Sequence, residues 1–199
     1  MGSTIRVATV EDAPAIRAIY APFVESTPIS FEVEPPTTQE MRARIKRTLD
    51  QYPWLVCETA DNEVIGYAAA SELRATPPYI WTVELSAYVR PDAQQAGVGT
   101  ALYTSLLETL EEQGYYNVYA VVTLPNPASI RLHKQMGFDP VGTFPTVGYK
   151  QGEWHDIQWW YRQLTDPPSD PDPPQPLSSL RETSELRQAL KTGQTYLDA

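Results

Sequence analysis

The strongest constraint on the fold is the way the spacing of apolar residues changes along residues 1–164. Ile5 and Val7 alternate with polar residues as in a strand, whereas Leu102, Leu106 and Leu110 repeat as on one face of a helix. Repeated switching between these two periods is typical of a layered fold that combines helices and strands. The chain has 199 residues, enough for one core of ordinary size. We therefore expect one domain of the α/β or α+β class.

The predicted elements follow one another in a definite order. They are a strand at 5–9, helices at 13–23 and 38–49, strands at 54–58, 64–69 and 81–89, a helix ending at Gly114, a strand at 117–122, a helix at 127–136, and strands at 140–149 and 154–163. Asp12 is the predicted N-cap of the first helix. Thr37 and Glu40 have the spacing of a capping box ahead of the second helix.

The composition of the chain changes after Leu164. Residues 166–176 read DPPSDPDPPQP, and proline favours an extended spacer because it lacks an N–H and has a fixed φ. The leucines of 177–199 have the spacing of one short helix, but they offer too little apolar surface for a domain. We therefore predict a domain at 1–164 and a tail at 165–199 that is either disordered or a short helix.

Charge and cysteine content exclude several classes of protein. Asp and Glu number 25 against 15 Lys and Arg, a net charge of −10 that opposes binding to nucleic-acid phosphates. The acidic bias indicates either a high-salt habitat or a solvated acidic surface. A single cysteine, Cys57, excludes an internal disulfide, and two histidines are too few for a structural zinc site. No apolar run approaches the ~20 residues that cross a bilayer, so we expect a soluble cytoplasmic protein with no metal and no membrane partner.

The most informative segment is 88–100, YVRPDAQQAGVGT, in which a strand runs through a loop into a helix. Gly97 and Gly99 remove side chains where the helix begins, so consecutive N–H groups are free to converge on a phosphate at the positive end of the helix dipole. A tight turn that needs glycine for φ alone is the alternative. The segment lacks the Lys-Ser/Thr pair of a Walker loop, and Leu102 stands where a dinucleotide fingerprint has its third glycine.

Gln94-x-x-Gly97-x-Gly99 resembles the pyrophosphate loop of the Gcn5-related N-acetyltransferases (GNAT). A closer resemblance, over residues 5–163, is to the phosphinothricin and methionine sulfoximine N-acetyltransferase branch of that superfamily. The matching segments are 30–35, 52–56, 81–84 with 88–89, 124–126, 132–133, 148–150 and 154–156. This resemblance implies a mixed, mostly antiparallel twisted sheet of about seven strands with about four helices, and a homodimer. The tail lies outside the resemblance.

The resemblance also implies that acetyl-CoA is the cosubstrate and that no metal is required. In the family the pantetheine arm enters between two splayed strands, here 81–89 and 117–122. Three strand residues are then expected to pair with the arm through their backbones, namely Ala87, Tyr88 and Val89. The loop expected to hold the pyrophosphate comprises Gln94, Gln95, Ala96, Gly97, Val98, Gly99 and Thr100. Asn126 is implied to contact the cofactor as well as to cap the following helix.

Acetyl transfer to an amine needs a neutral nucleophile, because an ammonium ion has no lone pair with which to attack a thioester. Glu84 lies between Val83 and Leu85 on the cofactor strand, where partial desolvation raises the pKa of a carboxyl toward that of a general base. The resemblance assigns it this role; a solvent-facing carboxylate is the alternative. His133 stands where many relatives have the tyrosine proposed to protonate the leaving thiolate. A hydrogen-bonded core histidine and a purely orienting role are its alternatives.

Phe31, Arg74 and Tyr79 are the candidates for the acceptor pocket. Arg74 would bind a carboxylate and the two rings would enclose the side chain. The spacing around Arg74 departs from that of the relatives, so an exposed, solvated arginine is the alternative. His155 is expected to pack in the fold or to contact a second copy of the chain, and Cys57 to be an inert core residue.

The predicted reaction moves an acetyl group from acetyl-CoA to the α-amino group of a small amino acid or analogue, of the phosphinothricin, methionine sulfoximine or methionine sulfone type. Glu84 accepts the amine proton, a backbone N–H near Val89 holds the thioester oxygen, and His133 assists departure of the thiolate. Three alternatives remain open. They are a non-catalytic acyl-CoA sensor, a dinucleotide-dependent oxidoreductase, and an acetyltransferase that acts on a protein N-terminus or a polyamine.

Overall fold

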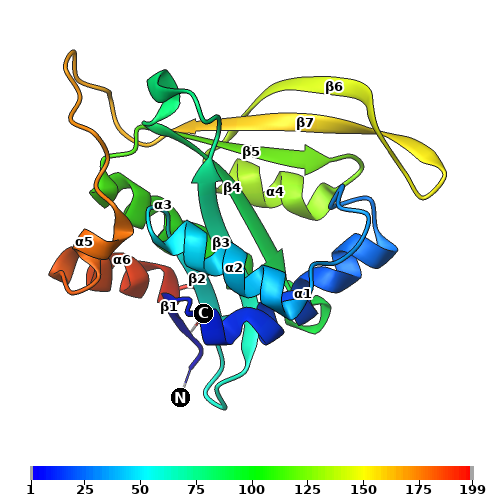
Figure 1. Ribbon diagram of the computed structural model, residues 1–199, viewed down its shortest axis with the longest axis horizontal. Coiled ribbons are helices and arrows are strands. Elements are labelled where there is room, and N and C mark those ends of the chain that lie inside the picture. Colours follow the sequence, from blue (N-terminus) through cyan, green and yellow to red (C-terminus); the bar gives the residue numbers. More distant parts are fainter. Residues whose placement is uncertain (1, 198–199) are drawn as a thin grey trace.

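A seven-stranded sheet with the order β1-β2-β3-β4-β5-β7-β6 forms the middle layer of the computed structural model, which describes residues 2–197 (Figure 1). The strands are β1 (Thr4–Val7), β2 (Trp54–Glu58), β3 (Val64–Glu72), β4 (Thr82–Val89), β5 (Asn117–Thr123), β6 (Asp139–Lys150) and β7 (Glu153–Gln163). The pairing of β4 with β5 is parallel, and the pairs formed by the other neighbouring strands are antiparallel. The predicted mixed, mostly antiparallel sheet is therefore confirmed.

Helices cover both faces of this sheet. They are α1 (Ala13–Ser26), α2 (Thr38–Leu49), α3 (Val98–Gln113), α4 (Pro127–Gln135), α5 (Leu177–Leu180) and α6 (Ser184–Gln194). In Figure 1, α1 and α2 lie in front of the sheet, and α3 and α6 lie behind it. The β6–β7 hairpin extends to one side at the top of the same view.

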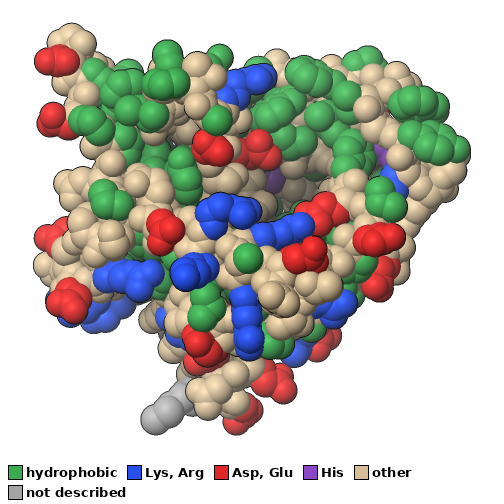
Figure 2. Space-filling model, in the orientation of Figure 1, with side chains coloured by type: hydrophobic (Ala, Val, Ile, Leu, Met, Phe, Trp, Pro, Cys, Tyr) green, Lys and Arg blue, Asp and Glu red, His purple; other side chains and the backbone are tan. Residues whose placement is uncertain are grey.

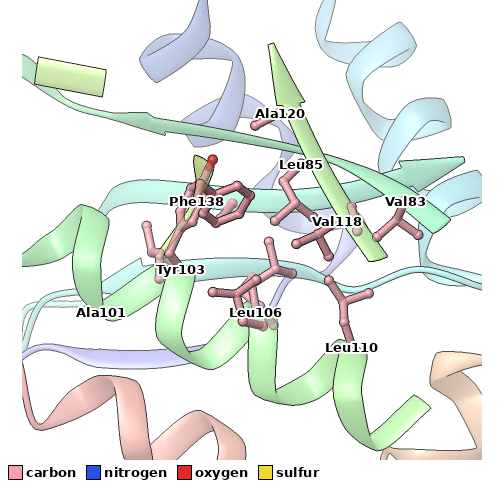
Figure 3. Packing of buried hydrophobic residues seen from close by; sticks show 14 of the residues in the cluster. Val83, Leu85, Ala101, Tyr103, Leu106, Leu110, Val118, Ala120 and Phe138 are labelled. Carbon is pink, nitrogen blue, oxygen red and sulfur yellow. The ribbon is translucent and has the colours of Figure 1, made fainter. Parts of the chain in front are cut away.

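Two apolar clusters, one on each face, hold the layers together. Val83 and Leu85 of β4 pack against Leu106 and Leu110 of α3, with all four side chains at most 3% exposed (Figure 3). On the other face, α1 and α2 cover a cluster that includes Tyr67. Because side chains alternate across a strand, Glu84, between the two buried residues of β4, points toward the α1–α2 face.

The predicted helix ends are mostly confirmed. Thr37 accepts the N–H of Glu40 while the Glu40 carboxylate accepts the N–H of Thr37, which completes the capping box of α2. α3 ends at Gly114 as predicted. Asp12 stands at the N-cap position of α1, but its carboxylate accepts the N–H of Thr9 and pairs with Arg6 instead of capping the helix. Strand β1 consequently ends at Val7, ahead of a 3₁₀ turn at Val10–Asp12.

In the C-terminal segment, Leu177–Leu180 and Ser184–Gln194 form the helices α5 and α6, and the division into a domain at 1–164 and a tail stays a prediction. The Pro-rich spacer is tied to the domain, since the Trp81 indole N–H donates to the Asp172 carbonyl at 2.8 Å and the Gln113 side chain donates to the Gln175 carbonyl at 2.7 Å. After it, the leucines that were too few for a domain of their own add to the existing core. Leu177 and Leu186 are 0% and 3% exposed.

Candidate active site

β4 and β5 are paired only along their first halves. Thr82–Leu85 is in register with Asn117–Ala120, but beyond these residues β4 pairs only with β3 and β5 only with β7. The predicted divergence of the two strands is thus confirmed. A cavity of about 610 Å³ opens between them. On the face drawn in Figure 2, the surface is hollowed between the β6–β7 hairpin and the two front helices, α1 and α2.

Beyond Leu85, β4 has no partner strand on its β5 side, and we call the gap between the two strands the wedge. The Val89 carbonyl in this gap accepts a hydrogen bond from the Gln94 side chain at 3.4 Å. The Arg90 N–H donates to the Ile65 carbonyl of the β3 side, and alternate residues of an antiparallel ladder direct their N–H and C=O to the same neighbour. Tyr88 therefore directs its backbone toward β3, whereas Ala87 and Val89 direct theirs toward the gap left by β5. All three residues line the cavity. Their pairing with a ligand stays a prediction, and the direction of the backbone favours Ala87 and Val89 over Tyr88 for it.

The N-terminus of α3 borders the same cavity. Gly97 occupies the N-cap position with φ 78°. Because glycine has no side chain, it cannot accept the first N–H groups of the helix. The first turn of α3 also contains no acidic residue. Thr37 and Asn126 cap α2 and α4 with their side chains. The first amides of α3 are therefore left to bind an anion. The predicted loop residues that line the cavity are Gln94, Gln95, Gly97, Val98, Gly99 and Thr100; Ala96 does not line it.

Glu84 lies at the base of the wedge, next to the last paired position of β4. It is in register with Ser71 of β3 and Tyr119 of β5, and its side chain lines the cavity. Burial raises the pKa of the Glu84 carboxyl above its usual value, with no cation or hydrogen-bond donor in the described chain to offset it. Glu84 is partly buried and lines the cavity, which favours the general-base assignment over a fully solvated surface carboxylate. A carboxylate in this setting is able to accept a proton from a bound amine.

His133 is 3% exposed on α4, where both ring nitrogens have partners. Nδ1 lies 2.8 Å from the Ser129 carbonyl oxygen, and Nε2 lies 3.1 Å from the Tyr103 hydroxyl. A carbonyl only accepts, so Nδ1 carries the proton and Nε2 accepts the tyrosine O–H. Burial also lowers the pKa of His133, which favours the neutral ring. This geometry supports the core and orienting alternatives over the acid.

One side of the cavity is formed by the segment that follows α1. Ser30 and Phe31 line the cavity there. The Tyr20 and Ser30 hydroxyls are 2.7 Å apart, and Lys150 of β6 donates to the carbonyls of Val24 and Ser30, both at 2.6 Å. This anchoring role of Lys150 was missed, because nothing in the sequence indicates that the end of β6 meets the segment after α1.

Arg74 and Tyr79 do not line the cavity, and both are exposed in the segment between β3 and β4. This segment precedes the paired half of β4, whereas the wedge opens at the strand's other end. Their assignment to the acceptor pocket stays a prediction. Arg131 of α4 does line the cavity, and it is the only cationic residue among the lining residues in the described chain. No motif distinguishes it in the sequence.

The remaining candidate residues have structural positions. His155 is 9% exposed and its Nε2 lies 3.0 Å from the Lys150 carbonyl, in agreement with the packing role. Cys57 is fully buried, and burial raises the pKa of its thiol to about 11, so it stays a protonated core residue at neutral pH. Across residues 2–197, no helix has the length and apolarity needed to cross a membrane. Within the same residues, no three metal-binding side chains are grouped together.

Known proteins share this architecture. Residues 5–159 match a family model described as an acetyltransferase (GNAT) domain. The chain is 40% identical over 176 residues to the phosphinothricin N-acetyltransferase of Streptomyces viridochromogenes, across 88% of this chain and 95% of that relative. It is 36% identical to an L-methionine sulfoximine/L-methionine sulfone acetyltransferase of Pseudomonas paraeruginosa, across 86% and 100% of the two chains.

The comparison extends to solved structures. The crystal structure of a phosphinothricin acetyltransferase from Sinorhizobium meliloti in complex with acetyl-CoA superposes with a TM-score of 0.81 at 33% identity, covering 87% of this chain and 97% of that one. The structure of a putative acetyltransferase from Salmonella typhimurium with acetyl-CoA also gives a TM-score of 0.81, at 35% identity, covering 86% and 99%. The family match and these relatives exclude the dinucleotide-dependent oxidoreductase. The chain belongs to the GNAT acetyltransferases, in the branch of the phosphinothricin and methionine sulfoximine N-acetyltransferases.

Proposed function

We propose that this GNAT enzyme transfers the acetyl group of acetyl-CoA to the α-amino group of a small amino acid or amino-acid analogue, with Glu84 as the general base. The observation that carries this proposal is the wedge between β4 and β5, which has free amides at one end and a desolvated carboxylate at its base. The residues fit acetyl-CoA as cosubstrate. The first amides of α3 suit the pyrophosphate, and the wedge-facing backbone of Ala87 together with the Val89 N–H suits the amide-containing arm.

The reaction begins with loss of a proton from the bound ammonium group to the Glu84 carboxylate. The amine nitrogen then attacks the thioester carbon, and the C–S bond breaks as the amide forms. The nitrogen's second proton goes to the departing thiolate, so charge and atoms balance. The raised pKa of Glu84 makes this carboxylate a stronger base than an exposed one, and its position next to the end of the β4–β5 pairing places it beside the incoming thioester.

The Ala87 N–H, the wedge-facing amide of β4 nearer to Glu84, is the proposed donor to the thioester oxygen, since the Val89 N–H lies next to the pyrophosphate loop. The Ala87 amide directs its hydrogen into the wedge and is fixed by the pairing of β4 with β3, so it stabilises the developing oxyanion without reorganisation. His133 has the orienting role, because its one N–H is donated to the Ser129 carbonyl and its other nitrogen holds the Tyr103 hydroxyl. Asn126 lines the cavity and caps α4, consistent with its predicted place at the cofactor.

The choice of acceptor is tested by thiol release from acetyl-CoA across a panel of amines. We expect turnover with phosphinothricin, L-methionine sulfoximine and L-methionine sulfone, because acetyltransferases named for these compounds align with most of the chain. Spermidine and a peptide with a free N-terminus represent the two other acceptor classes. Turnover confined to either of them would contradict the amino-acid proposal. Binding of acetyl-CoA in calorimetry without turnover of any of these amines would instead favour a sensor.

We also propose a homodimer formed through the β6–β7 hairpin. Val141, Tyr149 and Trp154 are 61%, 63% and 62% exposed on this hairpin, and hydrophobic side chains gather over it in Figure 2. Contiguous exposed apolar surface of this kind marks an interaction site.

The lone, buried Cys57 fits a reducing compartment, and we therefore place the dimer in the cytoplasm.

Replacing Trp154 with glutamate is expected to convert the dimer to a monomer, because a charge in an apolar interface is costly to desolvate. Light scattering coupled to size-exclusion chromatography measures the mass directly. Gln188→Glu adds the same charge on the exposed face of α6 and is expected to leave the mass unchanged. A wild-type chain that elutes as a monomer at micromolar concentration, or a dimer that survives Trp154→Glu, would contradict the assignment of this face.

A further inference from the structure

The C-terminal helix α6 lies directly on α3, the helix whose first turn borders the cofactor cavity (Figure 1). Leu186 and Ala189 of α6 are 3% and 2% exposed. The Ser105 hydroxyl of α3 donates to the Leu190 carbonyl at 3.1 Å, and the Gln194 side chain donates to the Ile5 carbonyl of β1 at 3.2 Å. These contacts fix α6 to the body of the enzyme. The family match ends at residue 159, so α6 is an addition to the matched domain.

The two helices approach most closely at Gly193. A Cβ at this position would collide with the Ala101 carbonyl and with the Ser105 hydroxyl oxygen. Both residues belong to the first half of α3. The absence of a side chain at Gly193 therefore allows backbone-to-backbone packing of the end of α6 against the beginning of α3.

The chain then continues past α6 to the cofactor loop itself. The Tyr196 carbonyl lies against the Cα of Gly97, where a Cβ would overlap it. Gly97 has φ 78° and also lines the cavity. One side of this residue thus faces the cavity and another rests on the C-terminal segment. The residue that precedes the first amides of α3 is therefore in contact with a segment from almost the other end of the chain.

We propose that the C-terminal segment Ser184–Leu197 positions the pyrophosphate loop for acetyl-CoA. This inference rests on the proposed function, since it takes residues 94–100 as the cofactor loop. The main contacts of α6 are with α3 and β1, and neither element contains Ser30 or Phe31 of the segment after α1. The influence of Ser184–Leu197 is therefore expected on cosubstrate affinity and not on the acceptor or on the chemical step. Because linkage is reciprocal, a bound cosubstrate must in turn stabilise the docked segment.

The first test removes the contact and keeps the helix. A chain that ends after Thr195 retains α6, which spans Ser184–Gln194, and loses Tyr196. Its Kd and KM for acetyl-CoA are expected to rise about three- to tenfold, while kcat at saturating acetyl-CoA and the KM for the acceptor stay at wild-type values. Gly193→Ala is the second variant, since it keeps every other residue but forces the helices apart. Arg187→Ala, on the exposed face of α6, is the matched control and is expected to change nothing.

Gly193→Ala distinguishes docking from helix stability by the sign of its effect. Alanine is a better helix former than glycine, so an undocked α6 would tolerate or favour the substitution. The proposal requires weaker acetyl-CoA binding in spite of this gain. Unchanged affinity for acetyl-CoA in both variants would overturn it.

Hydrogen exchange of the wild-type chain supplies a readout that does not depend on activity. Addition of acetyl-CoA is expected to slow amide exchange in Ser184–Leu197 as well as in the loop, and equal exchange with and without acetyl-CoA in this segment would contradict the proposal. The two levels of inference fail differently. If the wild-type chain does not bind acetyl-CoA, the proposed function is wrong. If it binds acetyl-CoA and the variants bind equally well, only the role of the segment is wrong.

Discussion

Replacing Glu84 with glutamine is expected to lower kcat by about 10²- to 10⁴-fold, the usual contribution of a positioned general base. The affinity for acetyl-CoA is expected to stay near the wild-type value, because the proposed contacts of the cosubstrate are with the backbone of Ala87 and Val89 and with the first turn of α3, and not with the Glu84 carboxyl. Glutamine has the same shape as glutamate but accepts no proton at neutral pH. Steady-state thiol release gives kcat, and calorimetry gives the Kd separately.

The Glu84→Gln variant is expected to lose activity without losing stability. Burial raises the pKa of Glu84 in the folded enzyme, so the ionised carboxylate is better solvated in the unfolded chain. The folded state therefore loses stability as the pH rises through that raised pKa. Glu84→Gln removes this cost, and its melting temperature at neutral pH is expected to equal or exceed that of the wild type. Activity lost together with stability kept is the result expected of a residue that serves the reaction.

The pH profile provides the decisive check on Glu84. In the wild type, kcat/KM is expected to rise with pH as Glu84 loses its proton, with an inflection above the usual glutamate value of 4.5. Glu84→Gln is expected to lose that inflection. Glu72→Gln, at the exposed end of β3 in the same sheet, is the matched control and is expected to keep both rate and profile. A rate within a few-fold of wild type in Glu84→Gln, or a loss of acetyl-CoA binding as large as the loss of rate, would contradict the assignment.

The candidate site could be predicted from the sequence because its main features are local. The strand that contains Glu84 leads directly into the loop that contains Gly97. The order of residues along the chain therefore places the Glu84 carboxylate close to a helix start that has no side-chain cap. The same holds for the helices, whose caps at Thr37 and Asn126 lie within four residues of the groups they bind. Such signals need no knowledge of the rest of the fold.

The features that could not be predicted depend on contacts between distant segments. The backbone of Tyr88 faces β3 because of the register between β3 and β4. The sequence of one strand does not determine its register with the neighbouring strand. The docking of α6 depends on Gly193 meeting Ala101, which lies more than 90 positions earlier in the chain. Asp12 was expected to cap α1, but the tertiary ion pair with Arg6 outweighs the local preference.

Replacing Thr100 with aspartate is expected to weaken acetyl-CoA binding by about 100-fold. Thr100 is the third residue of α3 and lines the cavity. A carboxylate there lies close to the amides that we assign to the pyrophosphate, and repulsion between like charges at about 6 Å reaches ~3 kcal/mol at the effective dielectric of a protein surface. Calorimetry at two salt concentrations measures this effect, and the loss is expected to shrink at the higher one because exposed charges are screened.

The same substitution is expected to stabilise the free enzyme, which makes the test independent of folding damage. An acid in the first turn of a helix interacts favourably with the dipole and with unsatisfied amides, by ~0.3–1 kcal/mol, and the first turn of α3 has none. Thr100→Asn, similar in shape to aspartate but uncharged, is expected to bind acetyl-CoA within a few-fold of wild type. If Thr100→Asp raised the melting temperature and still bound acetyl-CoA normally, the pyrophosphate would not lie at these amides. If the asparagine variant lost binding equally, shape and not charge would be the cause. Only weaker binding in a more stable protein, confined to the aspartate variant, agrees with an anion held by the start of α3.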